Sequence, residues 1–565
     1  MKPALRRTSV FLGMAFIFFM TQTAYASDVK LRPLNPNFIS NREAETDSKF
    51  SSPVDWSFLH GGEVRKDWFQ TLNSASRTGT QNALPASYDL STMNRVPPVR
   101  DQRSWGTCWA FSGIEAIESS LLSETGVLHD LSELHLAYFT YSFEDENKPG
   151  FTRDIKEIDP KKQNGIFDNG GLFEQVMAML SRGTGPVFES DAPYPEWLDD
   201  ADDLTWANYI PPAPYAPTRF RLKGAYVFHN ADEVKRALMN IGGLSFAFAS
   251  FGGRYLNNGS AFYNSDDNLE PDHAVLLVGW DDNYPRTNFL SSEDKVPLRD
   301  GAWKIQNSWG DVGSENGYFW ISYEDTSIFK DEWIESGAAA YVMEPLETYD
   351  GIYFHDPLVV SGVITLENHP EVRMSNAFVS KRNETVVSVG FFTGNLNIGY
   401  EIQIYRNIPE GMGPEGGKAA LAAPQKGRTG PKGYYSIALD NPVPIDKGER
   451  FAVEIKLIAD NESYPADQAH ATVEMMVYAT TDNASVAPEE SYLYLGGEWE
   501  DTYNILLDAS DFDNYSERNF NFNVKAFTKP RESRSGGSSG GCDGGMFTLL
   551  SLGVVALLGC VKSKK

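Results

Sequence analysis

Three stretches of the chain contain residues whose types could form a nucleophilic catalytic site. The first, residues 102–112, places Cys108 at the start of an expected helix that continues to Leu122. At a helix N-terminus the free backbone N–H groups and the helix dipole favour the thiolate, which is the nucleophilic form of cysteine. An isolated cysteine beside Trp and Ala is more often a buried apolar residue. Whether Cys108 does chemistry therefore depends on the partners that the rest of the chain supplies.

The second and third stretches supply a histidine and an asparagine. His273 begins a buried-looking strand, and Asn307 follows another strand-like run, residues 302–306. A histidine can remove the proton of a thiol as a general base, and a third polar group can hold the imidazole in the right orientation. With Cys108, these two residues complete a Cys/His/Asn set that could attack a carbonyl group.

In their order along the chain, these motifs resemble those of the papain-like cysteine proteases. The family pattern has a Gln several residues before Gly-x-Cys-Trp, then Asp-His-Ala, Asn-Ser-Trp-Gly and Glu-Asn-Gly-Tyr. This chain has Gln102 followed by residues 106–109, then residues 272–274, 307–310 and 315–318. Any one piece alone would be a weak signal, but these pieces in the right order rarely arise by chance.

The resemblance implies a role for each matching residue. Cys108 would be the nucleophile and His273 its general base, later the acid for the leaving amine, while Asn307 would orient the imidazole. The Gln102 side-chain amide and the Cys108 backbone N–H would donate to the oxyanion. Trp309 would cover the hydrogen bond between His273 and Asn307 from water.

A pair of glycines is expected to bind substrate. Residues 168–171, Asp-Asn-Gly-Gly, match the family's Asn-Gly-Gly segment. The resemblance implies that the backbone at Gly170 and Gly171, which carry no side chains, pairs with an extended substrate as one strand pairs with another. An ordinary glycine-rich turn is the alternative interpretation of the same residues.

Four positions depart from the family pattern. Trp105 and Asp168 stand where many members have two cysteines that form a disulfide, so both partners are missing together. Arg103 stands where a glycine usually follows the oxyanion Gln. Gly313 replaces a second Trp after Asn-Ser-Trp-Gly, which leaves the shape of the primed side of the cleft open.

The spacing between the motifs is long. His273 lies 165 residues after Cys108, and Asn307 lies 199 residues after it, against the roughly 130–150 residues typical of the family. Two segments of surface-loop composition, the charged 143–162 and the polar 281–301, are the expected insertions.

The fold that the resemblance implies would bring these residues together across a groove. It is an α+β fold with a helical lobe facing a β-barrel-like lobe, and residues 84–345 are long enough to form it around a full core. Helix-like patterns at 131–141 and 172–182 come first, so the cysteine falls in the helical half and the histidine and asparagine in the strand half. The strand-like runs are residues 244–250, 274–280, 302–306 and 318–323.

The N-terminal segment is predicted to direct export and then to inhibit. Residues 1–26 combine early basic residues, an apolar run and an Ala-x-Ala site, which is typical of a signal peptide. The run is shorter than the ~20 residues of a spanning helix, the alternative interpretation. Residues 27–83, polar with scattered aromatic residues, lie where a propeptide belongs, and by analogy we expect a removable segment that silences Cys108. A spacer or a permanent extension are the alternatives.

Residues 346–528 are predicted to form an all-β sandwich. Short runs that alternate with period two are separated by Gly, Pro, Asn and Asp, and the domain is similar to the lectin-like domains that follow the catalytic domain in some bacterial surface cysteine proteases. Residues 407–433, rich in Gly and Pro, do not fit a compact hairpin and are expected to be mobile. Residues 508–513 could ligate calcium, or form a solvated loop. The runs are residues 385–393, 400–405, 451–457, 472–478 and 520–527.

The C-terminal tail is a separate piece. Residues 529–545 form a linker rich in Gly and Ser, and residues 546–560 are apolar and precede three closing lysines. The segment 546–565 resembles the C-terminal sorting signals of bacterial surface proteins, which are cut and replaced by an anchor, and its basic end would stay cytoplasmic. A retained membrane helix is the alternative.

Composition excludes several other functions. The formal net charge is −28 and the sequence pI is about 4.7, so nucleic-acid binding has no electrostatic basis. Cys108 is the only cysteine between Ala26 and Cys542, so its thiol is free for chemistry and the exported core has no internal disulfide. No Cys/His cluster has metal-ligand spacing, and we expect no cofactor. The other seven histidines are interpreted as surface or structural residues: His60, His129, His135, His229, His355, His369 and His470.

The sequence therefore predicts an exported, surface-anchored papain-like cysteine endopeptidase made as a zymogen. Its partners would be protein or peptide substrates, a cell-wall or glycan ligand of the β-domain, and the membrane through the C-terminal segment. A surface adhesin with a silent protease domain is one alternative. A Cys/His acyltransferase such as a transglutaminase is another, but it would need Asp in place of Asn307. Substrate preference stays open, because the pocket residues lie on loops.

Overall fold

The computed structural model describes most of the chain between residues 83 and 531. The segments outside it include the predicted signal peptide, most of the expected propeptide, Asp168, Gly313 and everything from residue 532 on. No helix within the described part is both long enough and apolar enough to cross a membrane. The described residues are 29–33, 83–140, 142–144, 151–153, 167, 170–194, 218–329, 337–356, 362–366, 370–459, 473–479, 486–505, 507–508 and 517–531, except 104, 252, 257–258 and 313–314.

The first half of the described chain contains the long helices, and they are deeply buried. In α3 (Cys108–Thr125), residues 109–121 are all buried. Apolar residues occupy every side of this helix, which is typical of a helix inside a core. It ends at Gly126, whose φ of +72° is a left-handed conformation that glycine adopts without strain. Every residue of α4 (Glu133–Thr140) and α5 (Phe173–Ser181) is also buried.

One arginine pairs with a buried carboxylate on α3 and another on α4. The Arg100 guanidinium lies 2.8 Å from a Glu118 carboxylate oxygen and 2.7 Å from one of Glu133, and it also contacts Asp130. Removing one partner from such a buried set would leave an uncompensated charge, which is costly. The set therefore fixes the packing of α3 against α4.

A sheet follows the helices in the first half of the described chain. Its strands follow the order β5-β12-β6-β9-β10-β11-β8-β7, and β2 pairs with β9. One further helix, α7 (Ala231–Asn240), is capped by the Asn230 side chain, which accepts from the Glu233 N–H. The strands are β2 (Ser87–Asp89), β5 (Phe220–Phe228), β6 (Leu244–Phe248), β7 (Arg254–Leu256), β8 (Ala261–Tyr263), β9 (His273–Asp281), β10 (Ala302–Gln306), β11 (Tyr318–Ser322) and β12 (Ala338–Pro345), and a separate hairpin contains β3 (Ser142–Glu144) and β4 (Phe151–Arg153).

From residue 351 the described chain is built of strands. Seven of them form a second sheet, β18-β17-β21-β15-β23-β24 with β19 beside β17. Three others, β14, β22 and β27, form a four-stranded sheet in the order β1-β14-β22-β27, in which β1 comes from residues 29–33. The strands are β1 (Val29–Pro33), β13 (Gly351–Tyr353), β14 (Gly362–Leu366), β15 (Glu371–Val379), β16 (Glu384–Thr393), β17 (Gly399–Arg406), β18 (Lys418–Ala419), β19 (Gln425–Arg428), β20 (Lys432–Ile445), β21 (Arg450–Ile458), β22 (Val473–Ala479), β23 (Ser491–Leu495), β24 (Glu498–Asp501), β25 (Leu507–Asp508), β26 (Glu517–Arg518), β27 (Phe520–Phe522) and β28 (Lys525–Pro530).

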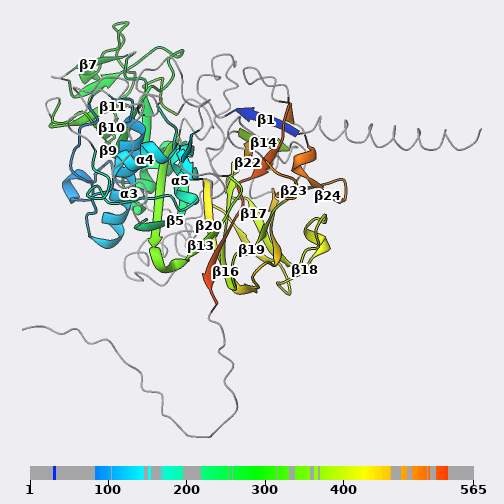
Figure 1. The fold of residues 1–565 in the computed structure, drawn as a ribbon. Coiled ribbons are helices and arrows are strands. Elements are labelled where there is room, and N and C mark those ends of the chain that lie inside the picture. The colour runs from blue at the N-terminus through cyan, green and yellow to red at the C-terminus, as the bar shows by residue number, and fades with distance from the viewer. Residues whose placement is uncertain are drawn as a thin grey trace, which may run out of the picture. The chain divides into compact units, whose positions relative to one another are not determined.

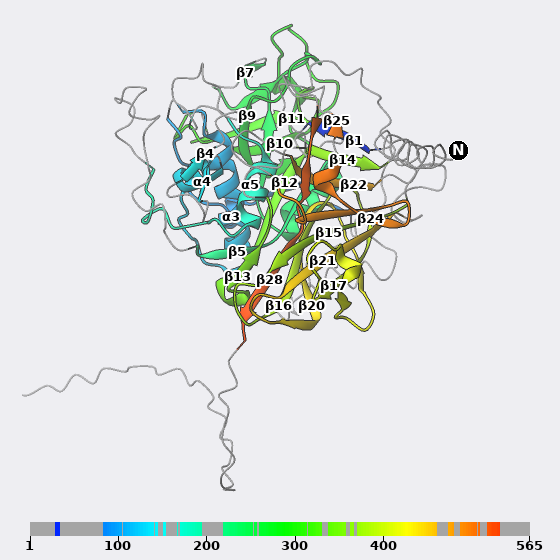
Figure 2. The same cartoon turned by 45° about the vertical axis from the view of Figure 1, so that its right-hand side comes forward.

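One sheet passes from the first half of the chain into the second. β20 pairs antiparallel with β5, so the strand order runs β13-β28-β16-β20-β5-β12 without a break (Figures 1 and 2). We call residues 224–227 and 432–435, which pair directly, the interdomain ladder. At its centre Gly433 has φ +140°, and a Cβ there would lie 2.0 Å from the Ala225 carbonyl oxygen. Only glycine allows this close approach.

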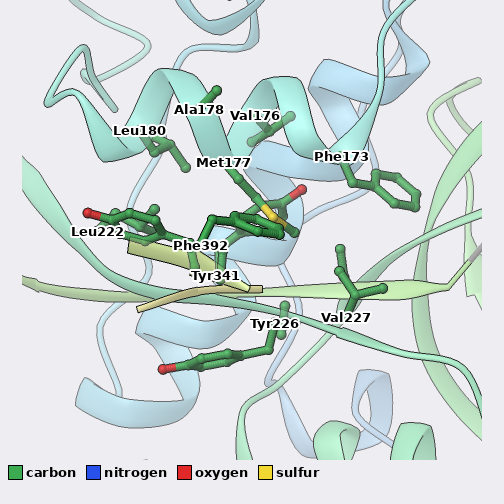
Figure 3. Packing of buried hydrophobic residues seen from close by; sticks show 14 of the residues in the cluster. Phe173, Val176, Met177, Ala178, Leu180, Leu222, Tyr226, Val227, Tyr341 and Phe392 are labelled. Carbon is green, nitrogen blue, oxygen red and sulfur yellow. The ribbon is translucent and has the colours of Figure 1, made fainter. Parts of the chain in front are cut away.

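The hydrophobic core also crosses the interdomain ladder. Met177 and other apolar residues of α5 lie over the sheet, above Leu222 of β5 and Tyr341 of β12, and Phe392 of β16 lies among them (Figure 3). The interior is therefore continuous between the helical lobe and the all-β part, instead of closing separately in each.

Most predicted elements are present, and two expectations were wrong. Residues 407–433 were expected to be mobile, but β18 and β19 within this segment both pair with β17. A polar segment can be fixed in this way because its backbone completes a sheet edge. Residues 520–527 were expected to be one strand. The chain instead breaks between β27 and β28, because β27 pairs with β22 while β28 pairs with β16 in a different sheet.

Glu174 leads to a stability prediction. It lies on α5 with its side chain fully buried, and neither carboxylate oxygen has a hydrogen-bond partner among the described residues. Burial raises the pKa of Glu174 to about 8. Between about pH 4.5 and pH 8 the native state keeps this proton while the unfolded chain loses it, so stability should fall as the pH rises. Glu174→Gln should remove this loss, on the order of 4 kcal/mol at pH 8 at about 1.4 kcal/mol per pKa unit.

Urea unfolding of Cys108→Ala, with and without Glu174→Gln, at the two ends of this pH range would test the prediction. Glu347→Gln, at an exposed position, is the matched control and should leave the pH dependence unchanged. If the free energy of unfolding changes with pH equally in the Glu174→Gln chain and its parent, the prediction is wrong and the Glu174 carboxyl has a compensating partner in solution.

Candidate active site

Cys108 is the first residue of α3, and Thr107 is its N-cap. Cys108 as a whole residue is half-buried, whereas the residues that follow it in the helix are buried. Burial alone would raise the pKa of Cys108, but a hydrogen bond to His273, the charge of His273, and backbone hydrogen bonds at Ala274 and Trp109 lower it overall. The surroundings of the sulfur therefore favour the thiolate overall.

His273 is the first residue of β9, where it pairs with Phe248 of β6. Its Nε2 lies 2.8 Å from Asn307 Oδ1, so its other ring nitrogen is the one available to Cys108. Burial would lower the pKa of His273, but the hydrogen bond to the Cys108 sulfur and its charge raise it overall. Opposite shifts at the two residues are those of a thiolate and imidazolium pair, in which each charge stabilises the other.

Asn307 follows β10 directly and is itself held in place. Its backbone N–H donates to the Gly317 carbonyl at 2.9 Å, and its Oδ1 also accepts from the Ser308 N–H at 2.9 Å. The Trp309 ring stacks on the His273 ring, with 4.7 Å between centroids and 22° between planes. The imidazole is thus fixed from one edge and covered on one face.

Gln102 lies beside these residues with its amide oriented. Its Nε2 donates to the Trp105 carbonyl at 2.6 Å, and its Oε1 accepts from the Ser308 hydroxyl at 2.6 Å. Its backbone N–H donates to the Ser308 carbonyl at 2.8 Å. The Ser308 hydroxyl bonds to the amide oxygen and one Nε2–H bonds to the Trp105 carbonyl. The second Nε2–H can therefore donate to another acceptor. Ser308 was not singled out from the sequence, although it lies inside the Asn-Ser-Trp-Gly motif.

Tyr194 ties the Gln102 loop to the start of α3. Its hydroxyl lies 2.9 Å from Thr107 Oγ1 and donates to the Gln102 carbonyl at 3.0 Å, while its ring packs edge-on against Phe111 at 4.9 Å. The sequence contains no signal for this contact, because Tyr194 follows Cys108 by 86 residues in a segment rich in Pro and acidic residues.

The departure at Arg103 has a visible structural consequence. Arg103 has φ +61°, in the left-handed region that favours glycine. Its N–H donates to Asp101 Oδ1 at 2.8 Å, and its guanidinium lies 3.8 Å from the same carboxylate. These contacts stabilise a non-glycine residue at a turn that the family usually makes with glycine. Trp105, at the missing cysteine position, is buried.

The two predicted substrate-binding glycines differ in what surrounds them. A Cβ on Gly171 would lie 2.2 Å from the Trp109 ring, so this glycine is needed for packing beside the nucleophile. Gly170 has φ +75°, and a Cβ added there would meet no atom within 4 Å, so packing does not require a glycine at this position, whereas the positive φ favours one. Asp168 and Asn169 lie outside the described residues.

The structure thus brings Cys108, His273, Asn307, Gln102 and Trp309 into one set, with Gly171 packed on the neighbouring Trp109. A thiol with a lowered pKa, an imidazole with a raised pKa and an oriented amide donor are the parts needed to attack a carbonyl carbon and to stabilise the oxyanion that forms. Among the residues that the structure describes, no group of three or more His, Cys, Asp or Glu could hold a metal ion. Of the acidic segment 508–513, only residue 508 is described.

Two family models match this chain. Residues 84–338 match the one described as "Papain family cysteine protease", and residues 352–528 match the one described as "Lectin like domain". "Probable cysteine protease RD19B" of Arabidopsis thaliana is 29% identical over 44% of this chain and 61% of its own length. A viral cathepsin of Heliothis zea nuclear polyhedrosis virus is 28% identical over 42% and 52%. The chain thus spans between half and two thirds of these relatives.

A solved structure extends the similarity to both parts of the chain. The protease and lectin-like domains of Cwp84, described as a surface layer associated protein of Clostridium difficile, superpose with a TM-score of 0.63. The match covers 85% of this chain and 98% of that one at 22% identity. At this identity the similarity supports the fold alone. It covers both domains in the same order along the chain.

Proposed function

Since residues 84–338 are a papain-family cysteine protease domain and residues 352–528 a lectin-like domain, we propose that the chain is an exported cysteine endopeptidase made as a zymogen. The observation that carries the proposal is the hydrogen-bonded series from Cys108 through His273 to Asn307, with the Gln102 amide oriented beside it. A domain that had lost its activity would have no need for all four residues.

In the proposed reaction the Cys108 thiolate attacks the carbonyl carbon of a peptide bond. The carbonyl oxygen becomes an oxyanion, which accepts from the Gln102 amide and the Cys108 backbone N–H. The tetrahedral intermediate collapses as the C–N bond breaks, and the His273 imidazolium gives its proton to the leaving amine. Water then attacks the acyl thioester while the imidazole takes a proton from it, and the thiolate and imidazolium are restored.

Asn307 and Trp309 would act on His273 rather than on the substrate. The Asn307 side chain keeps the imidazole turned toward the sulfur through both proton transfers, and the stacked Trp309 ring limits water on that face. Substrate would bind as an extended peptide beside Gly170, where a Cβ would meet no atom within 4 Å. The lectin-like domain would hold a cell-wall or glycan ligand.

Export and surface location rest on the sequence of both ends of the chain. The basic and apolar pattern of residues 1–26 and the linker, apolar run and lysines from residue 529 to the end support them. The similar structure from Clostridium difficile is described as surface layer associated. We assign residues 27–83 to the removable segment, so that cleavage before Leu84 gives the active form.

The oxyanion donor gives a quantitative prediction. Gln102→Ala should lower kcat/KM for a peptide substrate by about 10²–10³-fold, mostly through kcat, because its bond forms only as the oxyanion develops. Ser308→Ala should lower it by about tenfold, because the amide then loses the partner that fixes its orientation. Ser436→Ala, the matched control, removes a hydroxyl that pairs with Ser388 inside the lectin-like domain and should change little. Activity of Gln102→Ala within threefold of the parent would exclude Gln102 as a donor.

The experiment that tests the function compares residues 27–531 with the same chain carrying Cys108→Ala under reducing conditions. N-terminal sequencing follows trimming, and digestion of an unfolded protein follows activity. We expect the parent to trim itself near Ala83 and to digest the substrate until a thiol-trapping epoxide is added, and Cys108→Ala to stay full length. If neither chain cleaves anything, even after removal of the residues before Leu84, the endopeptidase proposal fails.

A further inference from the structure

The chain's N-terminal segment touches the lectin-like domain through β1. Residues 29–33 pair antiparallel with residues 362–366 of β14, from Val29 opposite Leu366 to Pro33 opposite Gly362. β1 forms the edge of the sheet β1-β14-β22-β27, and the two strands lie side by side in both views (Figures 1 and 2). More than 300 residues of sequence separate them, so this is a long-range contact of the segment that precedes the protease domain.

The register of this pairing is consistent with the residue types on the sheet. Positions 29 and 31 of β1 share a face with Leu366 and Ile364 of β14, and these pair in turn with Val473 and Met475 of β22. The residue types at these paired positions are apolar in all three strands. Lys30 and Arg32 occupy the alternate positions of β1. A slip by one residue would exchange the two faces, so the alternation specifies this register.

Pairing by β1 also covers an edge that would otherwise be open. β14 pairs along its whole length with β22 on one side and with β1 on the other. An uncovered strand presents a row of free N–H and C=O groups that invites another extended chain. Lys30, Arg32 and the closing Pro33 suit β1 to the outermost position, because lysine and proline are typical of protected edges.

We propose that residues 29–33 are a docking strand that holds the N-terminal segment on the lectin-like domain, and that cleavage before Leu84 releases it and opens the β14 edge. The release rests on the proposed zymogen, whereas the docking does not. While the chain is intact, the covalent link from β1 to the protease domain keeps β1 near β14 at an effective concentration in the millimolar range. Five residues pair too weakly to stay bound once that connection is cut. Maturation would therefore change the surface of the lectin-like domain as well as the active site.

Hydrogen exchange in the inactive Cys108→Ala chain beginning at residue 27 tests the docking, with Lys30→Pro and Leu31→Pro as matched variants. Along a strand, successive N–H groups point alternately toward and away from the partner, so only one of the two prolines removes a hydrogen bond to β14. We expect that variant to exchange amides of residues 362–366 about tenfold faster or more, and the other to resemble the parent. Equal exchange in all three chains would overturn the docking strand.

The release is tested on the parent chain before and after trimming. We expect the fragment that contains residues 27–83 to separate from the trimmed protein on gel filtration, and exchange in residues 362–366 to rise. A labelled peptide of residues 27–40 should bind the trimmed protein with a Kd on the order of 0.1 mM or weaker. A fragment that stays bound, with β14 still protected, would overturn the release. A chain that never trims would instead refute the endopeptidase proposal, and the exchange of the inactive variants would still decide the docking.

Discussion

Replacing His273 by alanine should lower kcat/KM by about 10⁴-fold or more, because this residue is both the base for the thiol and the acid for the leaving amine. It should also raise the pKa of Cys108. The hydrogen bond and charge of His273 lower the pKa of the thiol in the intact site, and without them burial, which raises it, becomes the larger influence. The fraction of thiolate at neutral pH should therefore fall together with activity.

Alkylation of Cys108 by iodoacetamide between about pH 4 and pH 10 would measure this change directly. The parent should react at a pH below the usual thiol range, and His273→Ala should need a higher pH than the parent. Asn307→Ala keeps the imidazole and removes its orienting partner, so it should lose activity while the thiol stays reactive at low pH. If the alkylation profile of His273→Ala matches that of the parent, the two residues form no ion pair, and helix α3 alone activates the sulfur.

Gly433→Ala should reduce the free energy of unfolding by about 4 kcal/mol or more. Its φ of +140° strains any L-residue, and the new Cβ would meet the Ala225 carbonyl oxygen at 2.0 Å. That oxygen belongs to the backbone of β5, so it cannot move without breaking the interdomain ladder. Backbone strain of this kind costs about 1–3 kcal/mol, and the clash adds the loss of pairing.

The matched control is Gly448→Ala. Gly448 also has a positive φ, +80°, but no atom lies within 4 Å of its Cβ position, so only the backbone cost of about 1 kcal/mol remains. Urea unfolding and limited proteolysis of both variants in the Cys108→Ala chain would separate strain from clash. Similar losses for the two variants would mean that the interdomain ladder does not form in solution.

The order of motifs predicted the fold and pointed to the main residues of the candidate site, because the chemistry limits which types can stand at each position. Cys108, His273 and Asn307 were identifiable in this way, as was Gln102. Residues that support them were harder to find. Tyr194 acts only through contacts made in three dimensions, and its sequence context is that of an ordinary loop.

The pairing of the two domains was not predictable either. Neither β5 nor β20 is among the strand-like runs expected from the sequence, and a period of two does not specify which strand lies beside which. Gly433 is the residue that permits the close approach of β20 to β5, but the sequence contains 48 glycines and nothing distinguishes this one from the others. The loop 407–433 was misjudged for a similar reason, since its residue types indicate solvent exposure while its backbone completes an edge of β17.

The interdomain ladder also bears on how such an enzyme would choose its target. A hinge between the domains would have to break main-chain hydrogen bonds of β5 and β20, so we expect the candidate active site and the lectin-like domain to keep a constant separation and a constant angle. A cell-wall or glycan ligand bound by the lectin-like domain would then hold the protease domain at a fixed position. Peptide bonds within reach of the active site would be cleaved, whereas identical sequences farther from the bound ligand would not. The position of a bond relative to that ligand would then select the substrate as strongly as the substrate pocket does.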